Sequence, residues 1–170
     1  MTDPLLVEGR AWVFGDEVNT DDMYPGFAMR LPVAEAARHM FDASRPDWPG
    51  LVEPGDIVVG GRNFGLGSSR PVALLFRELG VGALVAERFN TLFLRNCVNY
   101  GLPALTVPGI AGAVREGDRL RVDVRAGELT DLATGTTHAG TPLPDFLADI
   151  IQAGGLIPRL EASGHLRPTL

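Results

Sequence analysis

The residues best suited to chemistry lie in the glycine-rich segment 60–70, which reads GGRNFGLGSSR. This segment follows an apolar run typical of a short strand, residues 56–60, and precedes a run typical of a helix, residues 71–79. At such a junction backbone N–H groups and a helix N-terminus point toward the same space, which favours the binding of an anion. We therefore expect this segment to form a pocket for a negatively charged ligand.

The side chains at the end of the segment indicate what that ligand could be. Arg70 offers a planar guanidinium that suits a carboxylate, and Ser68 and Ser69 place two hydroxyls beside it. A serine hydroxyl acts as a base only if converging N–H donors and a fixed positive charge in a dry site lower its pKa by many units. Gly65 and Gly67 allow the backbone to approach closely enough to supply such donors. The alternative, that both serines only cap the following helix, stays open on the local pattern.

Three familiar glycine-rich motifs do not fit these residues. A dinucleotide-binding fingerprint needs glycine at the position of Arg70, and a nucleophile elbow needs glycine two residues after its serine. A phosphate-binding loop needs lysine, and all fifteen basic residues of this chain are arginine. The absence of lysine also excludes Schiff-base and serine–lysine catalysis.

The composition is that of a globular chain with an acidic balance. The 170 residues carry a net charge of −6 and are 45% hydrophobic, which is too apolar for disorder and too evenly interrupted for a membrane span. The acidic balance disfavours nucleic acid and anionic membranes as partners. The first residues show no signal peptide, so we expect a cytoplasmic location.

The single cysteine, Cys97, limits the metal chemistry. One thiol excludes an internal disulfide, a cysteine zinc cage and an iron–sulfur cluster held by this chain alone. We expect Cys97 to be a small core residue of an apolar helix and not a nucleophile. His39, His138 and His165 have no metal or triad spacing, so we expect them at the surface.

Glycine and proline punctuate the chain at short intervals, which indicates one α/β domain over residues 1–170 with a tail that frays from about residue 162. The apolar runs that predict strands lie at 5–14, 56–60, 83–86 and 105–107, and the alternating run 117–132 predicts a hairpin around Ala126 and Gly127. The patterns that predict helices lie at 33–41, 71–79, 88–100 and 144–153. The stretch 43–55 has no regular pattern, and the polar loop 15–26 is long for a connector.

Two strings in this chain resemble a known protein family. They are GDIVVGGRNFGLGSSR at residues 55–70 and LGVGALVAERFNTLFLRNCVNYGLPAL at residues 79–105. Both resemble the small subunits of 3-isopropylmalate dehydratase and homoaconitase, which correspond to the mobile C-terminal domain of aconitase on a separate chain. The early GDEVNTDDMYPG and the late FLADIIQAGGLIPRL fit the same family, so that the resemblance runs from about Val7 to Leu160.

The resemblance implies a swivelling β/β/α domain that closes over a large partner subunit carrying a 4Fe-4S cluster. This chain would bind no cofactor or metal itself, and the pair would be a hydro-lyase of leucine biosynthesis. By motif position Ser68 would remove a proton from the carbon next to a carboxylate, Ser69 would help hold the oxyanion environment, and Arg70 would bind a substrate carboxylate. The cluster iron would take the leaving hydroxyl, so that dehydration to a cis-unsaturated acid and rehydration would give an isomerisation.

The resemblance also implies that the loop after the early segment contacts the variable end of the substrate. Here that loop reads Phe27-Ala28-Met29-Arg30. Arg30 resembles the homoaconitase pattern more than the isopropylmalate pattern, whereas Ala28 and Met29 match neither. Arg30 is therefore either a second substrate-binding arginine or a solvated residue between loop and helix, and the choice of hydroxy acid stays open.

One departure from the family pattern follows the site arginine directly. The family continues with Glu-His-Ala, whereas this chain has Pro71-Val72-Ala73. Proline removes a backbone donor, and the missing side chains could have oriented Arg70 or the serines. The departure indicates a related enzyme for another hydroxy-diacid, such as a substituted malate or maleate, or a subunit with reduced activity. A carboxylate sensor without a partner and a non-catalytic scaffold subunit remain as alternatives.

Two further groups of polar residues have a structural explanation. Arg95, Asn96 and Asn99 share one predicted helix, and we expect them to support the site loop more than to contact the partner. The polar residues of the loop 15–26 lack regular metal-ligand spacing, so we interpret them as turn formers. These residues are Asp16, Asn19, Thr20, Asp21 and Asp22.

Overall fold

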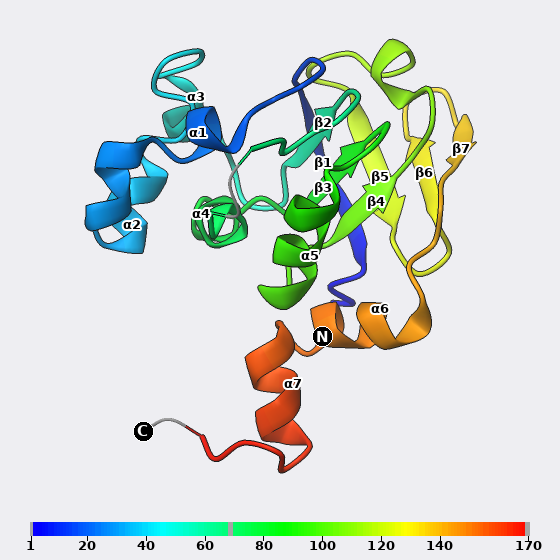
Figure 1. Ribbon diagram of the computed structural model, residues 1–170. Coiled ribbons are helices and arrows are strands. Elements are labelled where there is room, and N and C mark those ends of the chain that lie inside the picture. The colour runs from blue at the N-terminus through cyan, green and yellow to red at the C-terminus, as the bar shows by residue number, and fades with distance from the viewer. Residues whose placement is uncertain (1, 68–69, 169–170) are drawn as a thin grey trace.

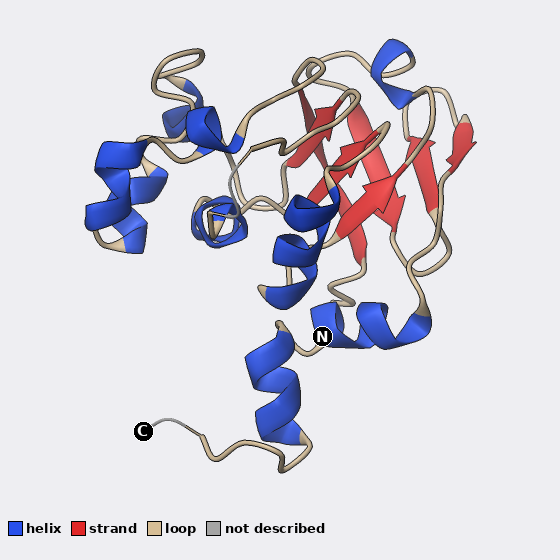
Figure 2. Ribbon diagram, viewed as in Figure 1, coloured by secondary structure: helices blue, strands red, loops and turns tan. Residues whose placement is uncertain are grey.

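Seven strands form one mixed sheet in the computed structural model, which describes residues 2–67 and 70–168 (Figures 1 and 2). The strands are β1 (Leu6–Val13), β2 (Ile57–Gly60), β3 (Ala83–Ala86), β4 (Ala104–Thr106), β5 (Arg119–Asp123), β6 (Glu128–Asp131) and β7 (Thr137–Ala139). Their order in the sheet is β4-β3-β2-β1-β5-β6-β7. β1 to β4 are parallel, and β5 to β7 join them as an antiparallel extension of β1.

Helices cover one face of the parallel half of the sheet (Figure 2). Each successive strand is added on the same side of the previous one, so right-handed crossovers place the connecting helices on a single face. α4 (Val72–Glu78) connects β2 to β3, and α5 (Thr91–Asn99) connects β3 to β4. The long connection from β1 to β2 contains α1 (Thr20–Met23), the 3-10 helix η1 (Gly26–Arg30), α2 (Val33–Ala37) and α3 (Trp48–Leu51).

The antiparallel strands and a C-terminal helix cover the opposite face. Leu120, Val122 and Leu129 of the hairpin pack with Ile57 and Val85 of the central strands. The final helices are α6 (Asp145–Gln152), which adds Ala148 and Ile151 to this cluster, and α7 (Leu156–Ala162). The sheet curls until its two ends meet. The N–H of Thr141, just after β7, donates to the carbonyl of Thr106 in β4 at 2.8 Å. β2 and β3 are consequently buried along their whole length, as their unbroken apolar sequences require.

Most predicted elements are confirmed. β3 has the predicted bounds, and the hairpin of β5 and β6 turns at Ala126 and Gly127. The helix predicted from residue 88 begins at Thr91, because Phe89 pairs with Phe64 as a β-bridge and Asn90 caps the helix. The helix predicted for 33–41 ends at Ala37, and the irregular stretch contains α3. β7, the short helix η2 (Ile110–Gly112) and α7 were not predicted, since none has a strong periodic pattern.

Cys97 lies in the core as predicted, with no exposed surface, and burial raises the pKa of its thiol well above the ordinary value. His165 is exposed, and His39 and His138 are half-buried. None of the helices over residues 2–67 and 70–168 is long and apolar enough to cross a membrane.

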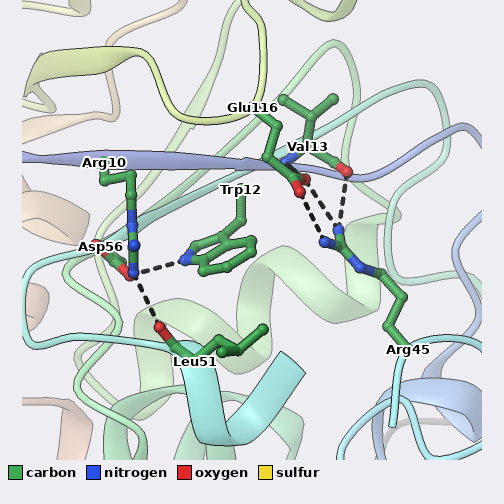
Figure 3. Close-up of polar contacts among 7 residues, drawn as sticks. All are labelled: Arg10, Trp12, Val13, Arg45, Leu51, Asp56 and Glu116. Atoms are coloured by element: carbon green, nitrogen blue, oxygen red, sulfur yellow. Dashed lines mark hydrogen bonds and ion pairs between the residues drawn. The ribbon is translucent and has the colours of Figure 1, made fainter. Parts of the chain in front are cut away.

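A buried carboxylate connects β1 to the segment before β2. Asp56 is 3% exposed and accepts hydrogen bonds from the Trp12 indole at 2.7 Å and the Arg10 guanidinium at 2.8 Å (Figure 3). It also accepts the Glu53 N–H at 2.9 Å. Arg10 also donates to the carbonyl of Leu51 in α3 at 2.9 Å. Burial raises the pKa of Asp56, but the hydrogen bonds outweigh that effect and hold it below the ordinary value.

A second ion pair fixes the C-terminal end of β1. Glu116 accepts the Val13 N–H at 3.0 Å and both terminal nitrogens of Arg45, at 2.9 and 3.1 Å (Figure 3). Arg45 also donates to the Val13 carbonyl at 3.2 Å and lies 4.8 Å from the ring centre of Phe14. The Arg45–Glu116 pair therefore joins the helical segment between β1 and β2 to the turn before β5, close to the edge where β1 ends.

Removal of the buried carboxylate should destabilise the fold. Asp56→Ala leaves the Trp12 N–H, the Glu53 N–H and the Arg10 guanidinium without their shared acceptor, and we expect it to lower the free energy of unfolding by about 2–3 kcal/mol. Because the folded-state pKa of Asp56 lies below the unfolded value, its stabilisation is complete above about pH 4 and is lost as the pH falls through the folded-state pKa. Urea unfolding at pH 7 and pH 3 measures both effects.

Asp47→Ala is the control, because Asp47 is exposed and its side chain makes no hydrogen bond within the described ranges. An equal loss of stability in the two variants, or a difference that grows in acid, would contradict the role given to Asp56.

Candidate active site

Three loops leave the C-terminal ends of β1, β2 and β3 side by side at one edge of the sheet (Figure 1). The central loop, residues 61–67, is hydrogen-bonded on both sides. On one side Gly61 N–H donates to the Gly15 carbonyl at 3.0 Å and Gly65 N–H to the Val18 carbonyl at 2.9 Å. On the other side Phe64 N–H donates to the Arg88 carbonyl, and its own carbonyl accepts Asn90 N–H, both at 2.9 Å. These bonds continue the parallel pairing of the strands into the loops.

Gly65 and Gly67 are required by the geometry of this loop. Both have a left-handed backbone, with φ of +83° and +110°. A Cβ at Gly65 would lie 2.1 Å from the ring of Phe93, and a Cβ at Gly67 would lie 2.8 Å from Oδ1 of Asn19. Only glycine lets the loop lie this close to α5 and to the loop after β1. The close approach seen here is to Phe93 and Asn19, and the predicted supply of N–H donors to the serine stays a prediction.

Backbone donors remain at the end of the loop. The N–H groups of Gly67 and Arg70 donate to no acceptor in residues 2–67 and 70–168, whereas Leu66 pairs with Asn19 in a parallel β-bridge. The start of α4 differs from the expectation of an open helix N-terminus. Its first N–H groups already have acceptors. Val72 N–H donates to the Arg70 carbonyl at 2.8 Å, and Ala73 N–H donates to Oδ1 of Asn96 at 3.0 Å. Donors for an anion lie in the loop before Pro71 and not in the first turn of the helix.

Arg70 is held against the segment that follows α1. Its Nη1 donates to the Tyr24 carbonyl at 2.6 Å, and its Nη2 lies 2.8 Å from Oδ1 of Asp21. The Arg70 side chain is 20% exposed and that of Asp21 is 61% exposed, so the ion pair lies at the rim of the site. Guanidinium carries five N–H donors, which leaves some for a ligand.

Ser68 and Ser69, the predicted base and its neighbour, lie outside the described residues. The chain on both sides of them is placed, with Gly67 ending the glycine loop and Arg70 preceding α4. Thr20, 2% exposed, lies beside this point, since its Oγ1 would be 2.9 Å from a Cβ at Gly67.

Arg30 lies at the end of η1 and is exposed. Its side chain makes no hydrogen bond or ion pair with any other residue that the structure describes. The start of η1 lies two residues after Tyr24, whose carbonyl binds Arg70. Two extended residues followed by four steps of about 2 Å in η1 keep Arg30 within about 15 Å of that carbonyl along the chain. Phe27 and Met29 on the same helix are 55% and 47% exposed.

The polar loop before η1 consists of turn and pairing residues. Asn19 caps α1 by accepting the Asp21 N–H at 2.8 Å, and Ser44 donates to Asp22 at 2.5 Å. Asp16 binds Arg62, whose side-chain and backbone hydrogen bonds lower the pKa of that carboxyl. The turn interpretation is confirmed for Asn19. Sequence reasoning missed that Asp21 pairs with Arg70, although a carboxylate in a loop expected near an arginine was a signal for it.

Comparison with known proteins agrees with this geometry. The sequence model of the aconitase C-terminal domain matches residues 39–109, which include the glycine loop and α5. The isopropylmalate/citramalate isomerase small subunit of Methanocaldococcus jannaschii is 42% identical over 92% of this chain and 94% of its own length. The chain belongs to the small-subunit family of 3-isopropylmalate dehydratase and homoaconitase.

Other members of this dehydratase small-subunit family differ in the substrate that their names give. The 3-isopropylmalate dehydratase small subunit 1 of Methanopyrus kandleri is 39% identical over 94% of this chain and 95% of its own. The methanogen homoaconitase small subunit of Methanothermobacter thermautotrophicus is 40% identical over 89% of each chain. A crystal structure of 3-isopropylmalate dehydratase from Methanocaldococcus jannaschii superposes with a TM-score of 0.87 at 30% identity, covering 94% of this chain and 96% of that one. The predicted family and α/β fold are confirmed.

The residues of this chain do not fit an iron–sulfur cluster. Its single thiol, that of Cys97 in α5, is enclosed in the core, and burial raises its pKa, which disfavours the thiolate that a metal needs. Within the described residues no three histidine, cysteine or acidic side chains gather as a metal site.

Substitution of Gly65 should disturb the loop more than substitution of a matched glycine elsewhere. Gly65→Ala combines a left-handed backbone with a Cβ that overlaps the Phe93 ring. We expect a loss of unfolding free energy of about 2–4 kcal/mol, the sum of backbone strain and overpacking. Thermal unfolding followed by circular dichroism measures this loss.

Gly109→Ala is the matched control, because Gly109 has φ of +79° and no atom within 4 Å of an added Cβ. That variant should lose only about 1–2 kcal/mol, the strain alone. Equal losses would mean that the contact with Phe93 does not constrain the loop.

Proposed function

We propose that this chain is the small subunit of a heteromeric hydro-lyase that dehydrates and rehydrates a 2- or 3-hydroxy di- or tricarboxylic acid. The observation that carries the proposal is the setting of Arg70. A partly exposed guanidinium, fixed by the Tyr24 carbonyl and paired with Asp21, lies next to a loop end with unused N–H donors. Guanidinium and amide donors together suit a carboxylate and the negative charge that develops beside it. Membership of the dehydratase small-subunit family supports the same reaction class.

In this proposal Arg70 binds a substrate carboxylate and Ser68 takes the proton from the neighbouring carbon. A serine alkoxide needs strong stabilisation, and the candidates in this chain are the N–H groups of Gly67 and Arg70 with the positive charge of Arg70. Ser69 adds a hydroxyl to the same environment. The departure at Pro71 is compatible with this arrangement, because the donors invoked precede it.

The proposed partner is a large subunit that carries the 4Fe-4S cluster, which would supply a Lewis acid for the leaving hydroxyl. The family name "small subunit" supports a larger partner. We propose that residues 1–170 move as one swivelling domain, so that closure brings the carboxyl edge of β1 to β3 against that partner. Closure would also exclude water, as an alkoxide base requires.

The substrate class follows from the surroundings of Arg30. The exposed Phe27 and Met29 could contact an alkyl group, and the unpaired Arg30 could bind a distal carboxylate. The relatives' names include isopropylmalate, citramalate and homoaconitase small subunits. The principal candidate is an isopropylmalate-type acid, and a homoaconitase-type or substituted-malate acid is the second candidate. A non-catalytic carboxylate-binding or scaffold subunit is the alternative outside enzymes.

Reconstitution tests the reaction. The purified chain mixed with its large subunit should hydrate a cis-unsaturated diacid, and neither chain alone should do so. The loss of ultraviolet absorbance of the double bond measures the reaction. Ser68→Ala should lower kcat by about a thousandfold or more, because no other base replaces the alkoxide. Complex formation, measured by size-exclusion chromatography, should be unchanged.

Ser163→Ala, in the exposed turn after α7, is the control and should keep full activity. Full activity in Ser68→Ala would refute the assigned base. A chain that binds diacids without a partner, or assembles but never supports turnover, would instead indicate a sensor or a scaffold.

Substitution of Arg30 tests the substrate assignment. Arg30→Ala should lower kcat/KM for an acid with a distal carboxylate about tenfold to hundredfold, since a charge-assisted hydrogen bond contributes about 1.5–3 kcal/mol. The same variant should change kcat/KM for isopropylmalate less than threefold. Arg119→Ala, an exposed arginine on β5, is the control. Equal effects on both acids would place Arg30 away from the variable end of the substrate.

A further inference from the structure

We propose that Asn96 of α5 is a positioning residue for the active-site loop, because it fixes the start of α4 directly behind Arg70. The inference rests on the proposed function and adds a residue that acts through another group. Asn96 was expected to support the site together with Arg95 and Asn99, and the contacts of these three residues differ.

The first turn of α4 lacks a side-chain cap of its own. Pro71 occupies the cap position, where it has no side-chain acceptor and no N–H. Val72 N–H turns back to the Arg70 carbonyl, and Leu74 N–H makes a long bond of 3.3 Å to the Pro71 carbonyl. The Asn96 side chain accepts the N–H between them, that of Ala73, at 3.0 Å. Asn96 therefore serves as the cap of α4, from a different helix.

The same helix also holds the other end of the loop. Phe93 lies against Gly65, so closely that a Cβ there would be 2.1 Å from the ring. Asn90, which caps α5, donates its N–H to the Phe64 carbonyl at 2.9 Å. Phe93 and Asn96 are three residues apart, which places them on one face of α5. Gly65 and Ala73, which lie on either side of Arg70 in the chain, thus both contact α5.

The attachment matters because Arg70 is only three residues from the bond that Asn96 makes. Without that bond the buried Ala73 N–H loses its acceptor, and the start of α4 can move toward another partner or water. A displacement of about 1 Å in a catalytic group costs up to about a hundredfold in rate. Arg95 and Asn99 are exposed, and their side chains make no hydrogen bond with the described residues, so of these three polar residues it is Asn96 that supports the site.

The experiment compares three variants of the chain assembled with its large subunit. Asn96→Ala removes the acceptor, Asn96→Asp keeps a side-chain oxygen at the same place, and Asn99→Ala on the same helix is the control. For each, kcat and KM are measured per mole of assembled complex, and hydrogen exchange of the Ala73 amide is measured on the small subunit by NMR.

We expect Asn96→Ala to lower kcat by tenfold or more, to raise KM a few-fold and to speed exchange of the Ala73 amide at least tenfold. Asn96→Asp should stay within about threefold of the unmodified chain in kcat, KM and amide exchange. The control Asn99→Ala should equal the unmodified chain in all three quantities. A merely structural role would reduce the amount of assembled complex and leave kcat and KM of each complex unchanged. That result, or an Asn96→Asp variant that folds but is as impaired as Asn96→Ala, would overturn the proposal.

The amide measurement separates this proposal from the proposed function. If the unmodified mixture hydrates none of the acids, the proposed function fails, and with it the role of Asn96 in a reaction, while slow Ala73 exchange that depends on Asn96 would still establish the helix cap. If Asn96→Ala leaves that exchange unchanged in a folded chain, the proposal fails even though the enzyme is active.

Discussion

The parallel pairing of β1, β2 and β3 is the constraint on which the site depends. Parallel strands end at one edge, and here the pairing continues beyond the strands, through the bonds from Gly61 and Gly65 to one neighbouring loop and from Phe64 to the other. β2 and β3 are buried along their whole length, so packing on both faces fixes their register. The buried central strands β2 and β3 therefore position the loop before Arg70.

The contacts of Arg70 show how such a loop can be rigid and still available to a ligand. The carbonyl of Tyr24 orients the guanidinium without neutralising it, and the exposed Asp21 carboxylate is screened by water. A substrate carboxylate can compete with Asp21 while the backbone bond persists. Because Pro71 leaves α4 without an N-terminal side-chain cap of its own, the donors for an anion shift into the loop, and a neighbouring helix has to hold the start of α4.

Sequence patterns predicted the elements whose signals are local. The short apolar runs gave β2 and β3, and the alternating run around Gly127 gave the hairpin. The pattern over 88–100 predicted a helix that begins at residue 88, whereas α5 begins at Thr91. The β-bridge of Phe89 competes with helix formation in these first residues. α3 and β7 were missed, since their stability comes from packing and pairing with distant residues and not from periodicity.

The sequence by itself determined the family, the glycine-rich loop between strand and helix, and the burial of Cys97, because each of these depends on residue types at short spacing. Only the tertiary structure decided that Asp21 and the Tyr24 carbonyl hold Arg70, that Asn96 caps α4, and that the first N–H groups of this helix are already used. The contacts of Arg70 and Asn96 join residues more than twenty positions apart. Hydrogen-bond partners at such separations depend on the distances that the folded sheet imposes, and no local pattern records them.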